Sequence, residues 1–135
     1  MLQQVSMREF EGIHNILIVE DDAADLLLLK KQLTKIWPES KIMAVRSIKD
    51  AYDVYKKNNV DLFLLDLNLP DGYGPQTVHE VRKLDKRTPI IVVTGLGNSI
   101  TVNEALRLGA NNVVLKSQIM DSDFANILEQ NKVAH

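Results

Sequence analysis

Short runs of aliphatic residues recur along the chain and alternate with longer amphipathic segments. The runs have the length of strands, and they lack the strict apolar and polar alternation of a strand with one exposed face. Continuous apolar runs of this kind are expected for strands that are buried on both faces of a sheet. The predicted strands are residues 16–19, 41–45, 61–66, 89–94 and 112–116.

The segments between these runs have apolar residues at helical spacing. The predicted helices are residues 23–37, 47–58, 74–84, 99–108 and 121–131. Five strands that each precede a helix predict parallel strands joined by right-handed crossovers, with helices on both faces of the sheet. We therefore expect an α/β fold with a doubly wound five-stranded parallel sheet, flavodoxin-like, in the strand order 2-1-3-4-5.

Polar residues at the predicted helix ends agree with these limits. Asp22 and Ser47 are suited to cap the first and second helices, and Asp25 adds an acid to the first turn of the first. Gly109 stands where the fourth helix should end. The sequence LPDGYG at residues 69–74 is typical of a turn directly after the third strand.

The first predicted helix has more leucines than one face requires. Its inward face should consist of Leu26, Leu29, Leu33 and Ile36, with Trp37 at its end. Leu27 and Leu28 are left over, and we expect them on the flanks or the outside of the helix. They form either a docking face or a surface that the segment containing Met7 and Phe10 folds back to cover.

The chain has 135 residues, which suits one domain, and its formal net charge of -2 shows no basic excess that would favour direct nucleic-acid binding. It contains no cysteine, so disulfides and thiolate metal sites are excluded, and a cytoplasmic location fits best. No apolar segment is long enough to suggest a signal peptide or a membrane span. We expect a lead-in at residues 1–13, one domain at 14–131 and a tail at 132–135.

Polar residues gather where the predicted strands end. They are Glu20 and Asp21 after the first strand, Asp66 and Asn68 after the third, Thr94 after the fourth and Lys116 after the fifth. In the expected strand order these ends are adjacent at the edge of the sheet where ligands bind. Carboxylates without Cys or His partners suit a hard cation, so the sequence predicts a Mg²⁺ site.

A Mg²⁺ site beside a lysine and a threonine indicates phosphoryl chemistry. The ammonium of Lys116 can neutralise the oxygens of a transferring phosphoryl group, and the Thr94 hydroxyl can donate a hydrogen bond to them. Asp66 is the expected nucleophile because it ends the central strand between the acidic pair and these two groups.

Four segments of the chain resemble the receiver domain of bacterial two-component response regulators, and the likeness extends over residues 14–131. The segments are VEDD at 19–22, LLDLNLPDG at 64–72, PIIVVTG at 89–95 and GANNVVLKS at 109–117. The resemblance implies a phosphorylation-dependent switch that receives a phosphoryl group on Asp66 from a sensor histidine kinase or a histidine phosphotransfer protein. Its downstream target would be another protein.

The resemblance also implies a role for each residue of the cluster. Asp21 would bind Mg²⁺ directly, Glu20 would act on it through water, and the main-chain carbonyl of Asn68 would complete the metal shell. Thr94 and Lys116 would hold the phosphoryl oxygens. Two positions depart from the usual pattern of the family, with Ser117 in place of proline and Val113 in place of an aromatic residue.

Two other functions remain open from the sequence. One is an aspartyl-phosphate phosphatase, which is disfavoured because such enzymes use an acid two residues after the nucleophile, and here that residue is Asn68. The other is a pseudo-receiver that binds partners without phosphorylation. The leading interpretation is a signalling phosphoacceptor that catalyses its own phosphorylation, not an enzyme that turns over a metabolite.

Overall fold

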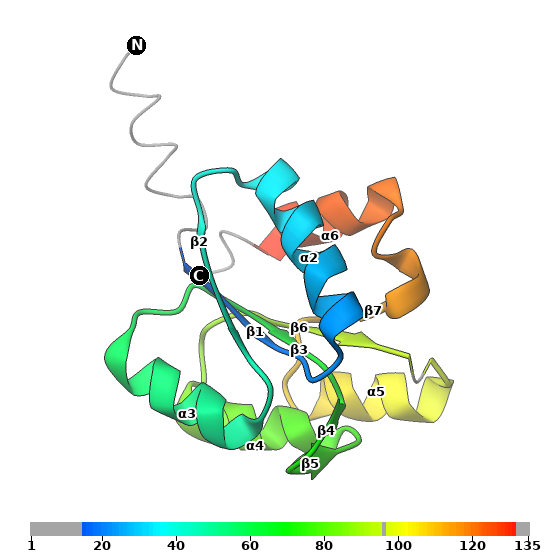
Figure 1. Ribbon diagram of the computed structural model, residues 1–135. Helices are drawn as coiled ribbons and strands as arrows, with labels where there is room; N and C mark the ends of the chain where they lie inside the picture. The colour runs from blue at the N-terminus through cyan, green and yellow to red at the C-terminus, as the bar shows by residue number, and fades with distance from the viewer. Residues whose placement is uncertain (1–14, 96, 132–135) are drawn as a thin grey trace.

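The computed structural model describes residues 15–95 and 97–131, and the expected lead-in at 1–13 and tail at 132–135 lie outside these ranges. A parallel five-stranded sheet forms its centre (Figure 1). Its strands are β1 (Asn15–Val19), β2 (Lys41–Val45), β3 (Leu62–Leu65), β6 (Ile90–Thr94) and β7 (Asn112–Leu115). Their order is β2-β1-β3-β6-β7, which confirms the predicted order of the five sheet strands.

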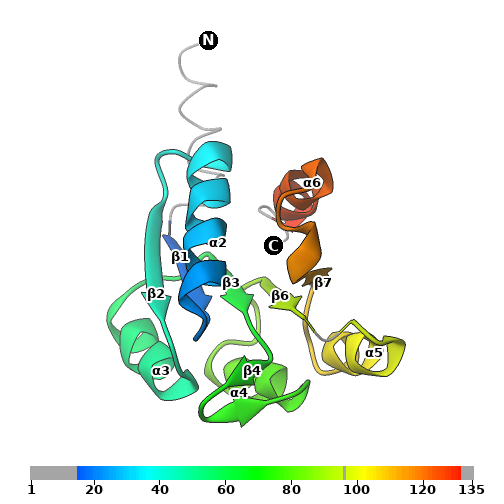
Figure 2. The ribbon, with the colours of Figure 1, turned by 45° about the vertical axis from the view of Figure 1, so that its right-hand side comes forward.

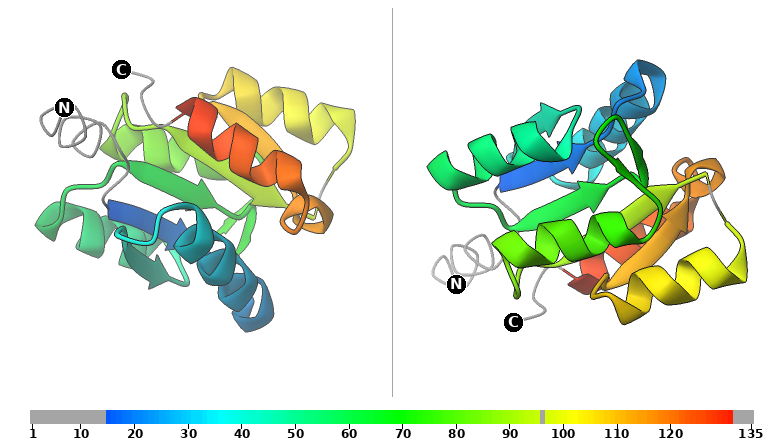
Figure 3. Two further views of the ribbon diagram at one scale, coloured as in Figure 1. Left: turned by 90° about the horizontal axis from the view of Figure 1, so that it is seen from above. Right: turned by 90° about the horizontal axis from the view of Figure 1, so that it is seen from below.

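Helices cover both faces of this sheet, as the alternating pattern predicts (Figures 1 and 2). They are α2 (Ala23–Ile36), α3 (Ile48–Lys57), α4 (Gln76–Leu84), α5 (Ser99–Arg107) and α6 (Ser122–Asn131). Helices α2 and α6 lie on one face, and α3, α4 and α5 lie on the other (Figure 3). Within the described ranges, no helix is long and apolar enough to cross a membrane.

Each face of the sheet has its own hydrophobic core. Successive residues of β1 point alternately into the two cores. Leu17 lies on the side of α3, α4 and α5, and Ile18 lies on the side of α2 and α6. Phe63 and Leu64 of β3 divide in the same way. Because all four side chains are fully buried, the continuous apolar runs of the sequence are explained by burial on both faces.

The helix caps agree with the sequence, but the segment after β3 differs from it. The Asp22 carboxylate accepts a hydrogen bond from the Asp25 N–H at 2.8 Å, and Ser47 caps α3 in the same way. The predicted turn at 69–74 instead forms a small antiparallel hairpin of β4 (Asn68–Leu69) and β5 (Gly72–Tyr73). Helix α4 consequently begins at Gln76, two residues later than expected.

The hairpin is anchored to the start of α3. Its Asp71 carboxylate accepts hydrogen bonds from the backbone N–H groups of Ile48 at 2.8 Å and Lys49 at 3.0 Å. Gly72 packs so closely that a Cβ atom there would lie 2.3 Å from the side chain of Ile48. These contacts fix the hairpin to a neighbouring helix, which the local turn sequence could not reveal.

Arg82, near the end of α4, joins three segments of the fold. Its guanidinium donates to the carbonyl oxygens of Gly109, Asp85 and Thr88 and to the side chain of Asn111. Gly109 has a positive φ of 120°, and a Cβ atom there would lie 3.0 Å from the Arg82 side chain. The glycine therefore permits both the helix end and the close approach of the arginine.

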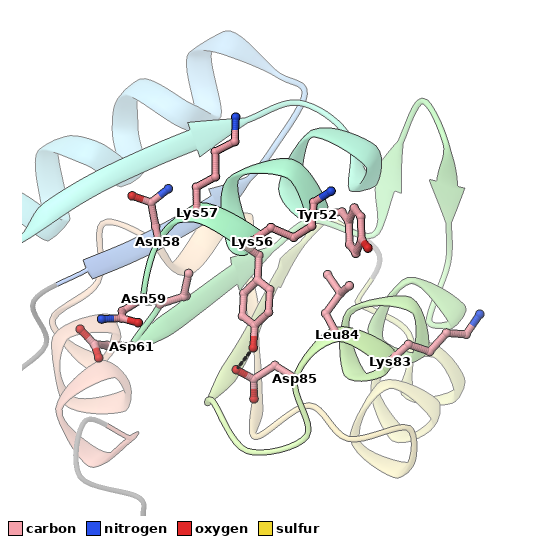
Figure 4. A pocket seen from close by; sticks show the side chains of 11 residues that line it. Tyr52, Lys56, Lys57, Asn58, Asn59, Asp61, Lys83, Leu84 and Asp85 are labelled. Atoms are coloured by element: carbon pink, nitrogen blue, oxygen red, sulfur yellow. Dashed lines mark hydrogen bonds between the residues drawn. The ribbon is translucent and has the colours of Figure 1, made fainter.

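An open groove of about 920 Å³ lies between the ends of α3 and α4, as Figure 4 shows. The Tyr55 hydroxyl donates to the Asp85 carboxylate there at 2.9 Å. Asp61, which also lines the groove, directly precedes β3, whereas Asp66 follows this strand. The groove is thus at the opposite end of β3 from the predicted cluster.

The arrangement of Arg82 predicts that Arg82→Ala lowers the free energy of unfolding by about 1 to 3 kcal/mol, because partly buried carbonyl oxygens lose charged donors. Lys83→Ala is the matched control, since this neighbour is exposed and, within the part of the chain that the structure describes, forms an ion pair only with Glu80. Its effect should stay within about 0.5 kcal/mol. Urea unfolding followed by circular dichroism measures both, and equal effects would contradict the structural role of Arg82.

Candidate functional site

Two acidic residues lie side by side where β1 and β3 end. Val19 and Leu65 are partners in the parallel register, so the residues that follow them, Glu20 and Asp66, emerge at the same edge. The backbone N–H of Asp66 donates to the Val19 carbonyl at 3.0 Å, which continues the sheet pairing to this point. Both acids are buried, with exposed fractions of 1% for Glu20 and 4% for Asp66.

The other predicted residues lie around this pair at the same edge. Thr94 is the last residue of β6 and is buried, and it pairs in register with Leu115, which directly precedes Lys116. Asp21 is exposed in the turn between β1 and α2. Asn68 is exposed at the start of β4.

Lys116 connects these elements through its ammonium group. Its Nζ atom lies 2.7 Å from Asp25 Oδ2, 3.2 Å from Glu20 Oε1 and 3.4 Å from Asp66 Oδ2. The structure therefore brings Glu20, Asp66 and Lys116 into contact, as the sequence predicts. Three carboxylates meet one ammonium, so the cluster carries an excess of negative charge when all of them are ionised.

The sequence model of the response regulator receiver domain matches residues 16–128. This chain belongs to that family. The match includes all six predicted site residues and both sides of the sheet, so the resemblance seen in the four sequence segments is confirmed.

Known relatives agree with this membership. The chemotaxis protein CheY of Thermotoga maritima is 31% identical over 101 residues, which are 75% of this chain and 83% of CheY. The luminescence regulatory protein LuxO of Vibrio campbellii is 34% identical over 99 residues, but these are only 21% of LuxO. The structure of the Mn²⁺-bound response regulator Rcp1 superposes with a TM-score of 0.71 at 26% identity, covering 87% of this chain and 90% of Rcp1.

The loop after β7 holds Lys116 in this receiver domain without the usual proline. Residues Lys116–Gln118 form a short 3-10 turn, and the Gln118 side-chain oxygen accepts a hydrogen bond from the Leu115 N–H at 2.9 Å. Ile119 follows and is fully buried in the core under α2 and α6. A side-chain hydrogen bond and an apolar anchor thus fix this loop on either side of Ser117.

Val113, which replaces the usual aromatic residue, is partly buried against the core on the side of α3, α4 and α5. Its partner in the sheet register is Val92 of β6. In this receiver domain the position therefore belongs to the packing of the sheet.

Burial and neighbouring charges shift the pKa values of the site in opposite directions. Burial, together with the charge of Asp66, raises the pKa of Glu20 to about 7, although the Asp22 N–H and Lys116 oppose the change. Burial alone would lower the pKa of Lys116, but the Asp25 hydrogen bond and the charges of Asp66 and Glu20 outweigh it and raise this pKa. The ammonium is thus strongly favoured, whereas the second buried carboxylate is costly to ionise.

Asp25 is the site residue that the sequence does not reveal. It was expected only as an acid in the first turn of α2, yet it makes the shortest contact to Lys116. Its place in the first helical turn after Asp21 puts Asp25 at the carboxyl edge of the sheet. This position was the only feature of the sequence that could have indicated a place in the site. The signal was insufficient because acids in first turns normally interact with the helix itself.

The residues of the site fit a hard cation in chemistry. Their donors are carboxylate oxygens, and among the described residues the buried Glu20 Oε1 accepts no hydrogen bond, although it lies 3.2 Å from the Lys116 ammonium. In residues 15–95 and 97–131, however, no three His, Cys, Asp or Glu side chains are grouped closely enough to hold a metal ion. The ammonium of Lys116 joins Glu20 to Asp66 in this arrangement.

Proposed function

We propose that this receiver domain accepts a phosphoryl group on Asp66 in a Mg²⁺-dependent reaction and thereby switches its binding to a downstream protein. The donor would be a sensor histidine kinase or a histidine phosphotransfer protein. The observation that carries the proposal is the position of Asp66, a buried carboxylate at the end of the central strand, 3.4 Å from the ammonium of Lys116. Family membership supports the same conclusion.

The chemistry is a transfer between two side chains. A carboxylate oxygen of Asp66 attacks the phosphorus of a phosphohistidine, the bond between phosphorus and nitrogen breaks, and the histidine nitrogen keeps the electron pair. Lys116 stabilises the negative oxygens of the phosphoryl group, and the Thr94 hydroxyl donates a hydrogen bond to them. Bound Mg²⁺ would neutralise part of the charge that develops on these oxygens.

Four residues are proposed to hold the metal. Asp21 and Asp66 would bind it through carboxylate oxygens, Glu20 through water, and Asn68 through its backbone carbonyl. The excess of negative charge around Lys116 supports this assignment. Rcp1, a relative of similar fold, is described with bound Mn²⁺.

Phosphorylation by a small-molecule donor distinguishes the proposal from its two alternatives, the pseudo-receiver and the phosphatase. Incubation with acetyl phosphate and Mg²⁺ should add one acid-stable, base-labile phosphoryl group to the protein, as seen in the intact mass. Asp66→Asn should abolish this gain because an amide is not a nucleophile. Asp71→Asn is the control for the loss of a nearby carboxylate; because Asp71 also anchors the hairpin to α3, its circular dichroism spectrum is compared with that of wild type.

Each alternative has its own outcome in that experiment. If the protein is a pseudo-receiver, even the wild type will gain no phosphoryl group from acetyl phosphate. A phosphatase would release many equivalents of phosphate from a small organic phosphate. A gain of mass that persists in Asp66→Asn would show that another residue is the acceptor.

For the metal, we expect Asp21→Asn to weaken Mg²⁺ binding roughly tenfold or more, because it removes a charged ligand. Isothermal titration calorimetry with MgCl₂ measures the affinity. Asp22→Asn is a close control, because asparagine caps a helix as well as aspartate does and Asp22 is not a proposed ligand. Equal affinities of Asp21→Asn and wild type would remove Asp21 from the metal site.

A docking surface for the donor is proposed on α2. Leu27 is 62% exposed in the described structure and lies near the start of α2, the helix that directly follows Glu20 and Asp21. Leu28 takes the flank position among the expected alternatives, because it is partly buried against the core that contains Leu29, so Leu27 alone is the exposed leucine of the pair. The alternative cover formed by Met7 and Phe10 lies outside the described residues.

If Leu27 contacts the donor, Leu27→Ser should slow phosphotransfer from a histidine phosphotransfer protein that phosphorylates the wild type, by roughly tenfold for a central interface leucine. Phosphorylation by acetyl phosphate should be unchanged. Ile100→Ser is the control, because Ile100 is 80% exposed on a different helix, α5. Equal slowing with both donors would indicate a damaged fold, and no slowing with either would contradict the docking surface.

A further inference from the structure

The shortest ion pair of the site joins Lys116 to Asp25, not to the proposed phosphoacceptor. The Lys116 Nζ atom lies 2.7 Å from Asp25 Oδ2, compared with 3.4 Å from Asp66 Oδ2. A lysine ammonium has three N–H donors, and here it faces three carboxylates. A phosphoryl oxygen that takes up this ammonium must therefore replace one of them.

The position of Asp25 in α2 shows that its carboxylate is available for this role. Asp25 is the third residue of the helix, where an acidic side chain commonly reaches back to the N–H of the cap residue. Here the N–H of the cap residue Asp22 donates to Glu20 Oε2 at 3.0 Å instead. Glu20 thus takes the usual contact of Asp25, and the Asp25 carboxylate is turned towards Lys116.

The three carboxylates differ in how easily they can release the ammonium. Glu20 is buried and also accepts the Asp22 N–H, and Asp66 is itself the residue to be phosphorylated. The Asp25 side chain is 29% exposed and lies at the N-terminus of a helix, where water and the helix dipole can stabilise its free charge. Of the three carboxylates, Asp25 can therefore release the Lys116 ammonium at the lowest cost in free energy.

We propose that Asp25 is a positioning residue that holds Lys116 in the unphosphorylated receiver and competes with the phosphoryl group for its ammonium. The proposal rests on the proposed function, since it assigns a regulatory contact to the same site. Removal of the competing charge should favour the phosphorylated form. Asp25 thereby sets how readily the receiver is activated.

Beryllofluoride with Mg²⁺ is the probe, because it binds an aspartate as a stable analogue of the phosphoryl group. We expect Asp25→Asn to tighten its binding by roughly two- to fivefold, the gain expected from removing one partly exposed ion-pair competitor. The amide NMR signals of the β6 end follow the titration. Asp25→Glu, which restores the charge, should return the affinity towards that of wild type.

Asp22→Asn is the matched control, because it also removes one negative charge from the start of α2, but Asp22 acts on Lys116 only through its charge and makes no hydrogen bond or ion pair with it among the described residues. Its affinity for beryllofluoride should change clearly less than that of Asp25→Asn. Unchanged or weaker binding by Asp25→Asn would overturn the proposal. Equal tightening by Asp22→Asn would overturn it as well, because the effect would then be one of general charge.

A second measurement separates this proposal from the proposed function. In the ligand-free protein, the side-chain ammonium NMR signal of Lys116 should shift and exchange faster with water in Asp25→Asn. An unchanged signal would overturn the Asp25 contact even if beryllofluoride binds. A wild type that binds no beryllofluoride while Asp25→Asn shifts the Lys116 signal would overturn the proposed function, and with it the competition, but would leave the positioning of Lys116 by Asp25 intact.

Discussion

The site is built on the burial of two carboxylates, Glu20 and Asp66, that share one ammonium. Like charges in a buried place repel and lose hydration, which is costly unless a cation is near. The consequence is visible in the raised pKa of Glu20 and in the raised pKa of Lys116. The parallel sheet imposes this arrangement, because adjacent strands of the same direction bring their last residues to one edge.

The fold was largely predictable because strands that are buried on both faces of a sheet appear in the sequence as continuous apolar runs. Ile18 and Leu64 must be as apolar as Leu17 and Phe63, since neither face meets water, and a strand of this kind has no polar positions. The β4–β5 hairpin has no comparable pattern in the sequence. Its form depends on Asp71 reaching the backbone of α3, a contact between segments that local turn propensity does not contain.

The residues of the site were predictable to the extent that strand ends determine them. Glu20, Asp66, Thr94 and Lys116 follow from the strand order, and all lie at the carboxyl edge. The partner of Lys116 was not predictable in the same way, because a long flexible side chain selects among several carboxylates within its reach. Which contact is shortest depends on the turn after β1, where Glu20 accepts the backbone N–H that Asp25 would otherwise be placed to bind.

The elements of the site differ in how firmly the backbone holds them. Asp66 and Glu20 extend the sheet pairing through backbone hydrogen bonds to Val19 and Val45, so a shift of either residue would break the pairing. Lys116 and Asp25 lie in a 3-10 turn and in a first helical turn, and their side chains carry the contact between them. A change of charge at Asp66 can therefore redistribute the contacts of these two side chains without displacing the strands. The proposed response to one phosphoryl group requires this division, because the strands supply the stability and the side chains beyond their ends supply the response.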